Sequence, residues 1–339
     1  MRYLIGLLTA LFIAFGGIYF YTNYKLSETY NTGESLQFEI PKGATSGEAI
    51  DILNGKGVLS PNWFYNLYFK FYLKTQNQTM KAGFYEMPGT VTAEAIIKEL
   101  VSGGSAKTKM VTVPEGLTSW EIASIFKKEL GVDSLTFMQY LRNDSLLSAH
   151  DISAPSAEGY LFPETYEFYE KFSNAQIIVE KMIEEGERFW NTSEEIASSG
   201  LLQELTKHET LTMASIVEAE TGDTTERAIV SGLYHNRLSM KMPLQANPTV
   251  QYGIGEKNRL LNKDLKHDSP FNTYLINGLP PGPINNPGRR AIVAAANPAE
   301  HNYIYMVAIG DGSGRHKFST NQKDHNTYVQ QYYRQRRNQ

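Results

Sequence analysis

The sequence predicts an α+β protein in three parts: one apolar N-terminal helix, a small α+β region, and a mixed α/β domain with long loops rich in proline and glycine. Three observations predict this organisation. Residues 4–21 carry no charge, strand-like and helix-like segments alternate through residues 35–132, and buried-type helices with proline-rich stretches follow. The expected domains are therefore residues 1–25, 35–132 and 133–335.

The N-terminal run LIGLLTALFIAFGGIYFY, residues 4–21, lies between Arg2 and Lys25. About 18 to 20 apolar residues suffice to cross a bilayer, and the tyrosines near its end suit the membrane interface. A cleaved signal peptide is the alternative, but the run is long and no A-x-A-like site follows it. We therefore expect an uncleaved single-pass anchor in the cytoplasmic membrane, with its N-terminus in the cytoplasm and the remaining chain in the periplasm.

Composition excludes several kinds of function. A formal net charge of -4 gives no reason to expect nucleic acid as a partner. The absence of cysteine excludes disulfides, thiolate metal sites and a catalytic thiol. His208-Glu209 lacks the second histidine of a zincin helix, and phosphate-binding glycine motifs are missing. We expect neither a metal nor another cofactor.

Two segments of residues 35–132 resemble each other. Residues 40–46 and 113–119 each predict a strand ending at a Pro-x-Gly turn, then a Thr or Ser N-cap and a short amphipathic helix, and a half-unit recurs at residues 85–101. The pattern resembles LysM-like carbohydrate-binding modules, and a spacer that binds nothing is an equal alternative. The aromatic run at residues 63–72 either stacks on sugar rings or, at its helical spacing, forms core.

Polar and aromatic side chains without an obvious packing role gather after residue 150. Residues 157–166 form a loop-like stretch with two acids, and residues 242–253 are predicted to be extended, with a turn at an Asn-Pro pair. Residues 269–288 hold five of the chain's 14 prolines, which predicts a long rigid loop. Such loops suit the hydroxyls and amides of an uncharged sugar polymer.

The most informative segment, residues 211–238, predicts two helices, the first of which places Glu218 in a run that is apolar all round. An acid in a buried helix must be protonated, paired or functional. Burial and the macrodipole of the last helical turn both raise its pKa, which suits a general acid. The alternative is a core glutamate paired with Arg227 or Arg237.

The neighbouring acids receive other interpretations. Glu220 lies two residues on and points to nearly the opposite side of the helix. Gly222 is expected to cap the helix, and the spacing Asp223-x-x-Glu226 fits a capping box for the next one. Glu226 thus has a sufficient structural role.

Six motifs then occur in order: ASIVEAET, RLSMKMPLQANPTVQYG, NTYLINGLPPGPINNPG, AAANP, YIYMVA and HKFSTNQKDHN. Together they resemble the YceG-like endolytic murein transglycosylases, also called MltG, from about Glu158 to the C-terminus and more loosely before it. The first Glu of that family's V-E-x-E-T motif is the catalytic acid, which falls on Glu218. Asn247 stands where the family commonly has Asp, which argues against a role that needs charge there.

The resemblance implies a lyase that cleaves the bond between N-acetylmuramic acid and N-acetylglucosamine in nascent peptidoglycan and leaves 1,6-anhydro ends. Glu218 would be its single acid/base, peptidoglycan strands its substrate, and membrane-bound peptidoglycan synthases its partners. A hydrolase using Glu158 or Glu164 as second carboxylate, or a non-catalytic cell-wall scaffold, are the alternatives. The residues expected to contact the glycan are Glu158, Gln245, Tyr252, Asn272, Thr273, Tyr274 and Asn286.

Overall fold

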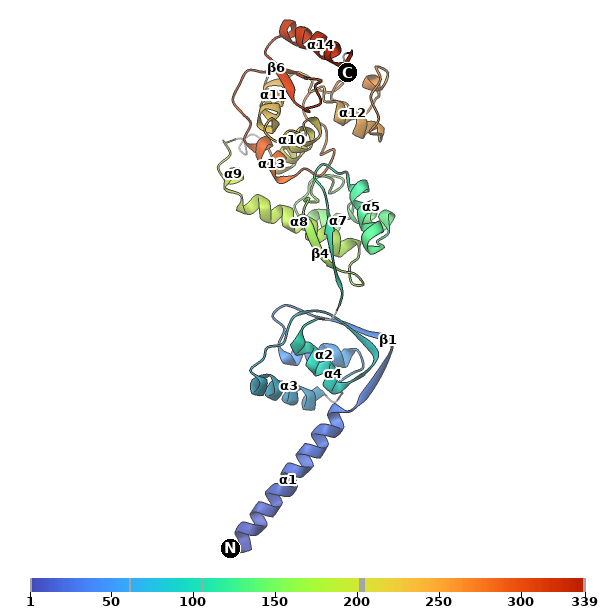
Figure 1. The fold of residues 1–339 in the computed structure, drawn as a ribbon, viewed down its shortest axis with the longest axis vertical. Coiled ribbons are helices and arrows are strands. Elements are labelled where there is room, and N and C mark those ends of the chain that lie inside the picture. Colours follow the sequence, from blue (N-terminus) through green and yellow to red (C-terminus); the bar gives the residue numbers. More distant parts are fainter. Residues whose placement is uncertain (1, 61, 105, 201–204, 338–339) are drawn as a thin grey trace. The chain divides into compact units, whose positions relative to one another are not determined.

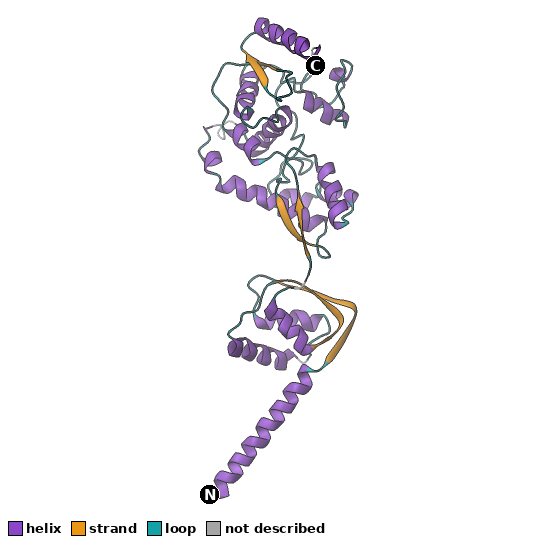
Figure 2. Cartoon of the chain, viewed as in Figure 1, coloured by secondary structure: helices purple, strands orange, loops and turns teal. Residues whose placement is uncertain are grey.

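The computed structural model describes residues 2–60, 62–104, 106–200 and 205–337, so Met1 of the predicted cytoplasmic stub lies outside it (Figures 1 and 2). Its chain forms two compact units. The N-terminal unit comprises residues 1–109 with residues 169–172, and the C-terminal unit comprises the rest. Helices and strands are both present, as the predicted α+β class requires.

The N-terminal unit begins with the predicted apolar helix, α1 (Arg2–Leu26). Its stretch Ile5–Leu26 is long and apolar enough to cross a membrane, and none of it is buried. The helix predicted at residues 4–21 is therefore confirmed as an apolar helix, and its insertion into a membrane stays a prediction.

Beyond α1, the N-terminal unit is a two-stranded antiparallel sheet covered by helices. Phe38 lies opposite Tyr85 in the register, and their stacked rings have centroids 4.9 Å apart in the core. The sugar-binding role of a LysM-like module stays a prediction. The elements are β1 (Thr29–Ile40), α2 (Ser46–Gly55), α3 (Asn62–Gln76), β2 (Gly83–Thr92) and α4 (Ala93–Ser102).

The strand–turn–helix repeats are confirmed as local structure. Thr45 and Thr118 each cap a helix through a complete capping box, and Thr92 caps α4 by accepting from the N–H of Ala95. Each cap satisfies backbone N–H groups that the first turn leaves unpaired.

The second repeat, however, lies in the C-terminal unit, whereas the prediction grouped residues 110–132 with the N-terminal region. Val111, Val113 and Phe126 are buried in the core of the C-terminal unit, which is why the boundary falls after Lys109. Local periodicity predicted these elements but carried no information on which core receives them.

The C-terminal unit surrounds one buried helix, α10, whose residues Thr210 to Val217 are buried on every side. This helix packs against α11, α12 and α13. In order, the elements that lie wholly or mostly in this unit are β3 (Thr108–Thr112), α5 (Ser119–Leu130), α6 (Ser134–Tyr140), α7 (Asp144–Ala149), β4 (Thr165–Tyr169), α8 (Ala175–Thr192), α9 (Glu194–Ala197), α10 (Lys207–Glu220), α11 (Arg227–Ser239), α12 (Asn247–Ile254), η2 (Asp264–Lys266), α13 (Arg289–Ala296), β5 (Tyr305–Ala308), β6 (His316–Ser319) and α14 (Gln322–Arg337).

The end of α10 differs from the prediction. The helix ends at Glu220, and its cap is Thr221 in an extended conformation rather than Gly222. The capping box predicted for α11 is absent, because Asp223 accepts from the N–H of Thr225 and the Glu226 side chain makes no cap. Glu226 instead accepts from the backbone N–H of His316 at 3.0 Å.

Residues 242–253 also differ, because the predicted extended segment contains the helix α12. Pro248 occupies the first turn, where its missing N–H costs nothing, and Gly255 closes the helix in the left-handed conformation with φ of 82°. The Asn-Pro pair therefore starts a helix instead of a turn. Residues 267–288 contain no helix or strand, and β5 pairs antiparallel with β6.

Candidate active site

Glu218 is buried in an ion pair. Its Oε1 lies 2.5 Å from Nη2 of Arg227, and its Oε2 accepts from the N–H of Gly288 at 3.0 Å. Only 7 % of the Glu218 side chain and 6 % of the Arg227 side chain are exposed. Burial raises the pKa of Glu218, while the Gly288 N–H and the Arg227 charge oppose that rise. The arginine pair that the sequence left open as an alternative is thus present.

Two glycines allow the chain to close around Glu218. A Cβ on Gly116 would lie 3.3 Å from Cγ of Glu218, and a Cβ on Gly288 would lie 1.9 Å from Glu115. Glu115 also reaches Arg227 at 3.4 Å. Because only glycine permits such close backbone approach, these positions are part of how the sequence builds the ion pair.

Glu220, the last residue of α10, lines a polar cavity of about 330 Å³. Burial raises the pKa of its carboxyl, opposed by a hydrogen bond from Tyr234 and by the charges of His316 and Arg237. Among the described residues Glu220 forms no salt bridge, in contrast to Glu218. The cavity is lined by Glu220, Leu233, Tyr234, Arg237, Gln245, Asn247, Tyr274, Met306, Val307, Ala308, His316 and His325.

The polar neighbours of Glu220 are held in place by the fold. Arg237 donates to the carbonyl oxygens of Ile304 at 2.7 Å and Leu244 at 2.6 Å. Tyr274 donates its hydroxyl to Oδ1 of Asn247 at 2.7 Å, so the Asn247 amide N–H groups remain available to a ligand.

His316 faces the same cavity from β6. Its Nδ1 lies 3.0 Å from Oε2 of Glu226. Glu226, predicted as a helix cap, therefore orients a cavity-lining imidazole.

A second cavity of about 820 Å³ lies between α5, α12 and the loop before β4. The indole of Trp120, half exposed, lines it together with Tyr252 and Glu158. Its lining residues are Gly116, Thr118, Trp120, Glu121, Met138, Arg142, Ser156, Glu158, Ala219, Pro248, Gln251, Tyr252, Gly255, Glu256, Lys257, Ile284 and Asn285.

Glu158 is the buried acid of this second cavity. Its Oε1 accepts from the N–H of Ser119 at 3.0 Å and from Nδ2 of Asn286 at 2.9 Å. Burial raises the pKa of Glu158 to about 7, although these hydrogen bonds and the Tyr252 hydroxyl act in the opposite direction.

The two cavities are lined by neighbouring residues of α10 and α12. Glu220 and Asn247 line the first, and their chain neighbours Ala219 and Pro248 line the second. Of the predicted contact residues, the fold thus brings Gln245 and Tyr274 beside Glu220, and Tyr252 beside Glu158.

Three other predicted contact residues are fully buried with protein partners. Asn272 donates to the carbonyl oxygen of His267 at 2.8 Å, and Thr273 bonds to Thr249 at 2.8 Å. Asn286 accepts from the N–H of Gly159 at 2.9 Å and donates to Glu158. These side chains brace the loops, and their geometry gives no support to a direct contact with a ligand.

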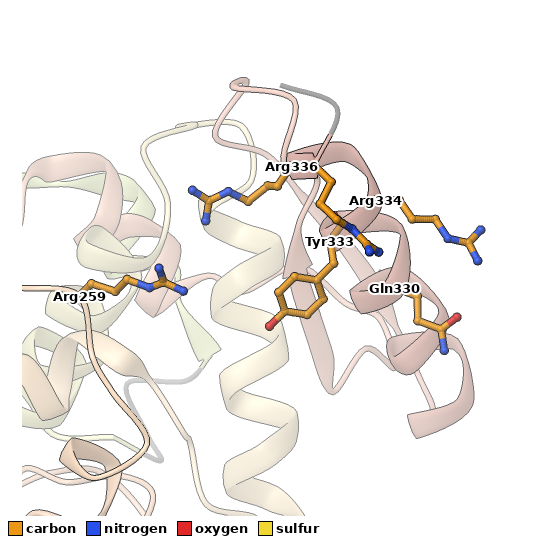
Figure 3. A pocket seen from close by; sticks show the side chains of 6 residues that line it. Arg259, Gln330, Tyr333, Arg334 and Arg336 are labelled. Atoms are coloured by element: carbon orange, nitrogen blue, oxygen red, sulfur yellow. The ribbon is translucent and has the colours of Figure 1, made fainter.

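Another hollow lacks the same chemistry. A hollow of about 800 Å³ near the C-terminus is lined by Gln330, Tyr333 and several arginines, with no carboxylate (Figure 3). Among the described residues no cluster of three or more histidine and acidic side chains could hold a metal ion. Sequence reasoning missed Trp120 and His316, and it named Arg237 only as a possible partner of Glu218. It set Glu220 aside although the E-x-E spacing at a helix end was visible.

Comparison with known proteins gives consistent results. The YceG-like family model matches residues 38–331. An endolytic murein transglycosylase of Bacillus subtilis is 31% identical over 335 residues, covering 94% of this chain and 90% of that protein. An enzyme of the same name from Streptococcus pneumoniae is 28% identical, covering 97% of this chain and 65% of its own length. The crystal structure of a yceG-like protein from Listeria monocytogenes aligns with a TM-score of 0.59 at 31% identity, covering 87% of this chain and 99% of that one.

Proposed function

Since this chain belongs to the YceG-like family, we propose that it is a membrane-anchored endolytic lytic transglycosylase of peptidoglycan. It cleaves the bond between N-acetylmuramic acid and N-acetylglucosamine and leaves 1,6-anhydromuramoyl ends. The observation that carries the proposal is Glu220, an acid with a raised pKa that forms no salt bridge among the described residues and lines a polar cavity whose other lining residues include no carboxylate.

A single carboxyl group completes this reaction. Protonated Glu220 donates its proton to the glycosidic oxygen as the bond from that oxygen to C1 of the muramoyl residue breaks. The C6 hydroxyl of the same residue then bonds to C1 and returns its proton to Glu220. No water is consumed, so the second carboxylate of an ordinary glycosidase is not needed.

The neighbours of Glu220 suit this cycle. Burial and the negative end of α10 both disfavour the carboxylate, so Glu220 retains its proton above its ordinary pKa of 4.5. Once the proton is donated, Tyr234, Arg237 and His316 stabilise the anion. The amide of Gln245, the Asn247 amide and the Tyr274 hydroxyl line the same space and suit the polar groups of a sugar.

Glu218, the acid predicted from the sequence, is the second candidate. Its pKa is also raised, and it lies one residue from the wall of the second cavity. The ion pair with Arg227 favours the charged form, however, and both side chains are almost fully enclosed. We therefore place the acid/base role on Glu220 and a structural role on Glu218.

The second cavity extends the proposed substrate path. Endolytic cleavage requires sugars on both sides of the broken bond, and a single cavity of 330 Å³ beside Glu220 is small for that. The cavity of about 820 Å³ offers the aromatic faces of Trp120 and Tyr252 with polar groups around them. We propose that the glycan strand continues from Glu220 past Ala219 and Pro248 into this cavity.

The test is product analysis on purified glycan strands with the intact protein and two matched variants. The intact protein is expected to give 1,6-anhydro ends, Glu220→Gln to give none, and Glu218→Gln to retain cleavage. Reducing ends would instead indicate a hydrolase with Glu158 or Glu164 as second carboxylate. No cleavage by the folded intact protein would favour a cell-wall scaffold.

Location follows the same proposal. The apolar helix α1 suits a single-pass anchor with its N-terminus in the cytoplasm and both units in the periplasm. That position places the enzyme beside nascent strands and the membrane-bound synthases that make them.

A further inference from the structure

Helix α3 carries an unusual exposed face for a globular unit. Trp63, Leu67 and Phe71 are 60%, 66% and 64% exposed, and they follow one another at a spacing of four residues. This spacing places the three side chains on one side of the helix. Lys70 and Lys74 are exposed on the same side, and α3 contains no acidic residue.

The opposite side of α3 is ordinary core. Phe64, Tyr65 and Phe69 are buried in the N-terminal unit. The aromatic run at residues 63–72 is therefore divided, with part of it forming the core as one sequence interpretation expected. Of the exposed part, Trp63 meets the ring of Phe64 edge-on with centroids 6.1 Å apart, and most of its surface remains exposed.

The position of α3 relative to α1 identifies what covers this face. The ring of Tyr21, near the end of the apolar stretch of α1, meets the ring of Phe64 edge-on with centroids 5.3 Å apart. The Tyr65 hydroxyl lies 2.9 Å from the carbonyl oxygen of Lys25. Figure 1 shows α3 at the end of its unit that α1 enters. The start of α3 thus lies beside the end of the apolar stretch of α1.

We propose that the exposed face of α3 lies in the membrane interface and binds lipid. This inference rests on the proposed anchoring of α1. Tryptophan favours the headgroup level, leucine and phenylalanine favour the upper acyl chains, and the two lysines suit anionic headgroups. In this position α3 holds the N-terminal unit against the bilayer. The aromatic rings of this face then bind lipid and not sugar.

The chain contains three tryptophans, Trp63, Trp120 and Trp190, which allows a matched fluorescence test. One full-length variant keeps only Trp63, through Trp120→Phe and Trp190→Phe. The control keeps only Trp120, which is 50% exposed in the other unit. Both are reconstituted in vesicles of phosphatidylcholine with one quarter phosphatidylglycerol, with and without bromine atoms on the upper acyl chains.

We expect brominated lipid to reduce Trp63 emission about twofold and aqueous iodide to leave it almost unchanged, since an interfacial helix lies about 5–10 Å deep. Trp120 is expected to behave in the opposite way. In the Trp63-only protein, Lys70→Glu with Lys74→Glu is expected to lessen the quenching in these anionic vesicles, and both positions are exposed, so the fold is retained.

Co-flotation with the vesicles separates the possible failures. If the protein still floats with the vesicles but Trp63 emission is quenched by iodide and not by brominated lipid, the proposed role of α3 is overturned and the anchoring by α1 is retained. Loss of flotation overturns both, and neither result changes the glycan-cleavage test of Glu220. In lipid-free detergent, protection of Trp63 from iodide that grows as the protein concentration rises would show that a second copy of the chain covers this face. That result would also overturn the proposal.

Discussion

Glu218 and Glu220 lie two residues apart on α10, but their side chains have different surroundings. Glu218 is enclosed by Arg227, the N–H of Gly288 and the close approach of Gly116. Glu220 faces a polar cavity, with Tyr234, Arg237 and His316 near it but no salt bridge among the described residues.

The difference teaches that a raised pKa alone does not identify a catalytic acid, since burial raises it for both carboxyls. What distinguishes the two acids is their surroundings, because Glu220 lines a cavity without a salt bridge among the described residues, whereas Glu218 is held in an ion pair. An acid sealed in an ion pair stabilises the fold, and an acid that faces a cavity can exchange a proton with a ligand.

The strongest test of this comparison is the loss of the acid at Glu220. We expect Glu220→Gln to lower kcat by about 10³-fold or more, because a general acid typically contributes about 10²–10⁴-fold and here the same group also acts as the base. Formation of anhydro ends, measured by mass spectrometry, gives the rate, and thermal unfolding checks the fold. Cleavage above a tenth of the normal rate would remove Glu220 from the mechanism.

Glu218→Gln should give the converse result, a loss of stability with cleavage retained in the folded fraction. Removing one partner of a buried ion pair costs about 3–5 kcal/mol, since the other charge is left uncompensated. Urea unfolding of Glu218→Gln, Arg227→Gln and the double variant measures this cost and the coupling between them. Unchanged stability with abolished cleavage would move the acid to Glu218, as the sequence predicted.

Glu158 extends the comparison to a third buried carboxyl, through the pH dependence of stability. Its pKa is raised from 4.5 to about 7, so between these values the folded state binds more protons than the unfolded state. Stability therefore falls as pH rises through this window, by up to about 3 kcal/mol, and is constant above it. Urea unfolding at several pH values measures the slope.

Glu158→Gln is the matched variant for this slope. It loses hydrogen bonds at every pH, so its stability is lower overall, but the fall between pH 4.5 and about 7 should disappear. An unchanged slope in the variant would mean that another group titrates in this window.

The sequence predicted the helices around Glu218 and Glu220 well, but it predicted poorly which groups contact these two acids. The apolar run from Leu211 predicted a buried helix, and Arg227 was named as an alternative partner for Glu218. Which of the two acids is enclosed depends on Glu115 and Gly288, which contact Arg227 and Glu218. Both residues lie far from α10 in sequence and come near it only in the folded chain.

Similar long-range contacts explain the other differences. Glu226 had the spacing of a cap, but the backbone of His316 in β6 binds its carboxylate instead. Asn272, Thr273 and Asn286 had the polarity of ligand-binding residues, but their side chains are buried and bond to other parts of the chain. Asn272 donates to the carbonyl oxygen of His267, Thr273 bonds to Thr249, and Asn286 bonds to Gly159 and Glu158. The Asn-Pro pair of α12 was ambiguous locally, since proline opens both turns and helices.

The smallest expected effect tests whether the site of Glu220 extends into the second cavity. Trp120→Ala removes an aromatic face at a distance from the acid, so it should remove binding that substrate and transition state share. We expect KM for long glycan strands to rise about tenfold with kcat unchanged, since aromatic contacts contribute about 1 kcal/mol or more beyond their buried area. Leu135→Ala, at an exposed position on α6 outside both cavities, is the matched control. Equal KM values in the two variants would show that the substrate occupies only the cavity of Glu220. The different roles proposed for Glu218 and Glu220 would then depend on that cavity alone.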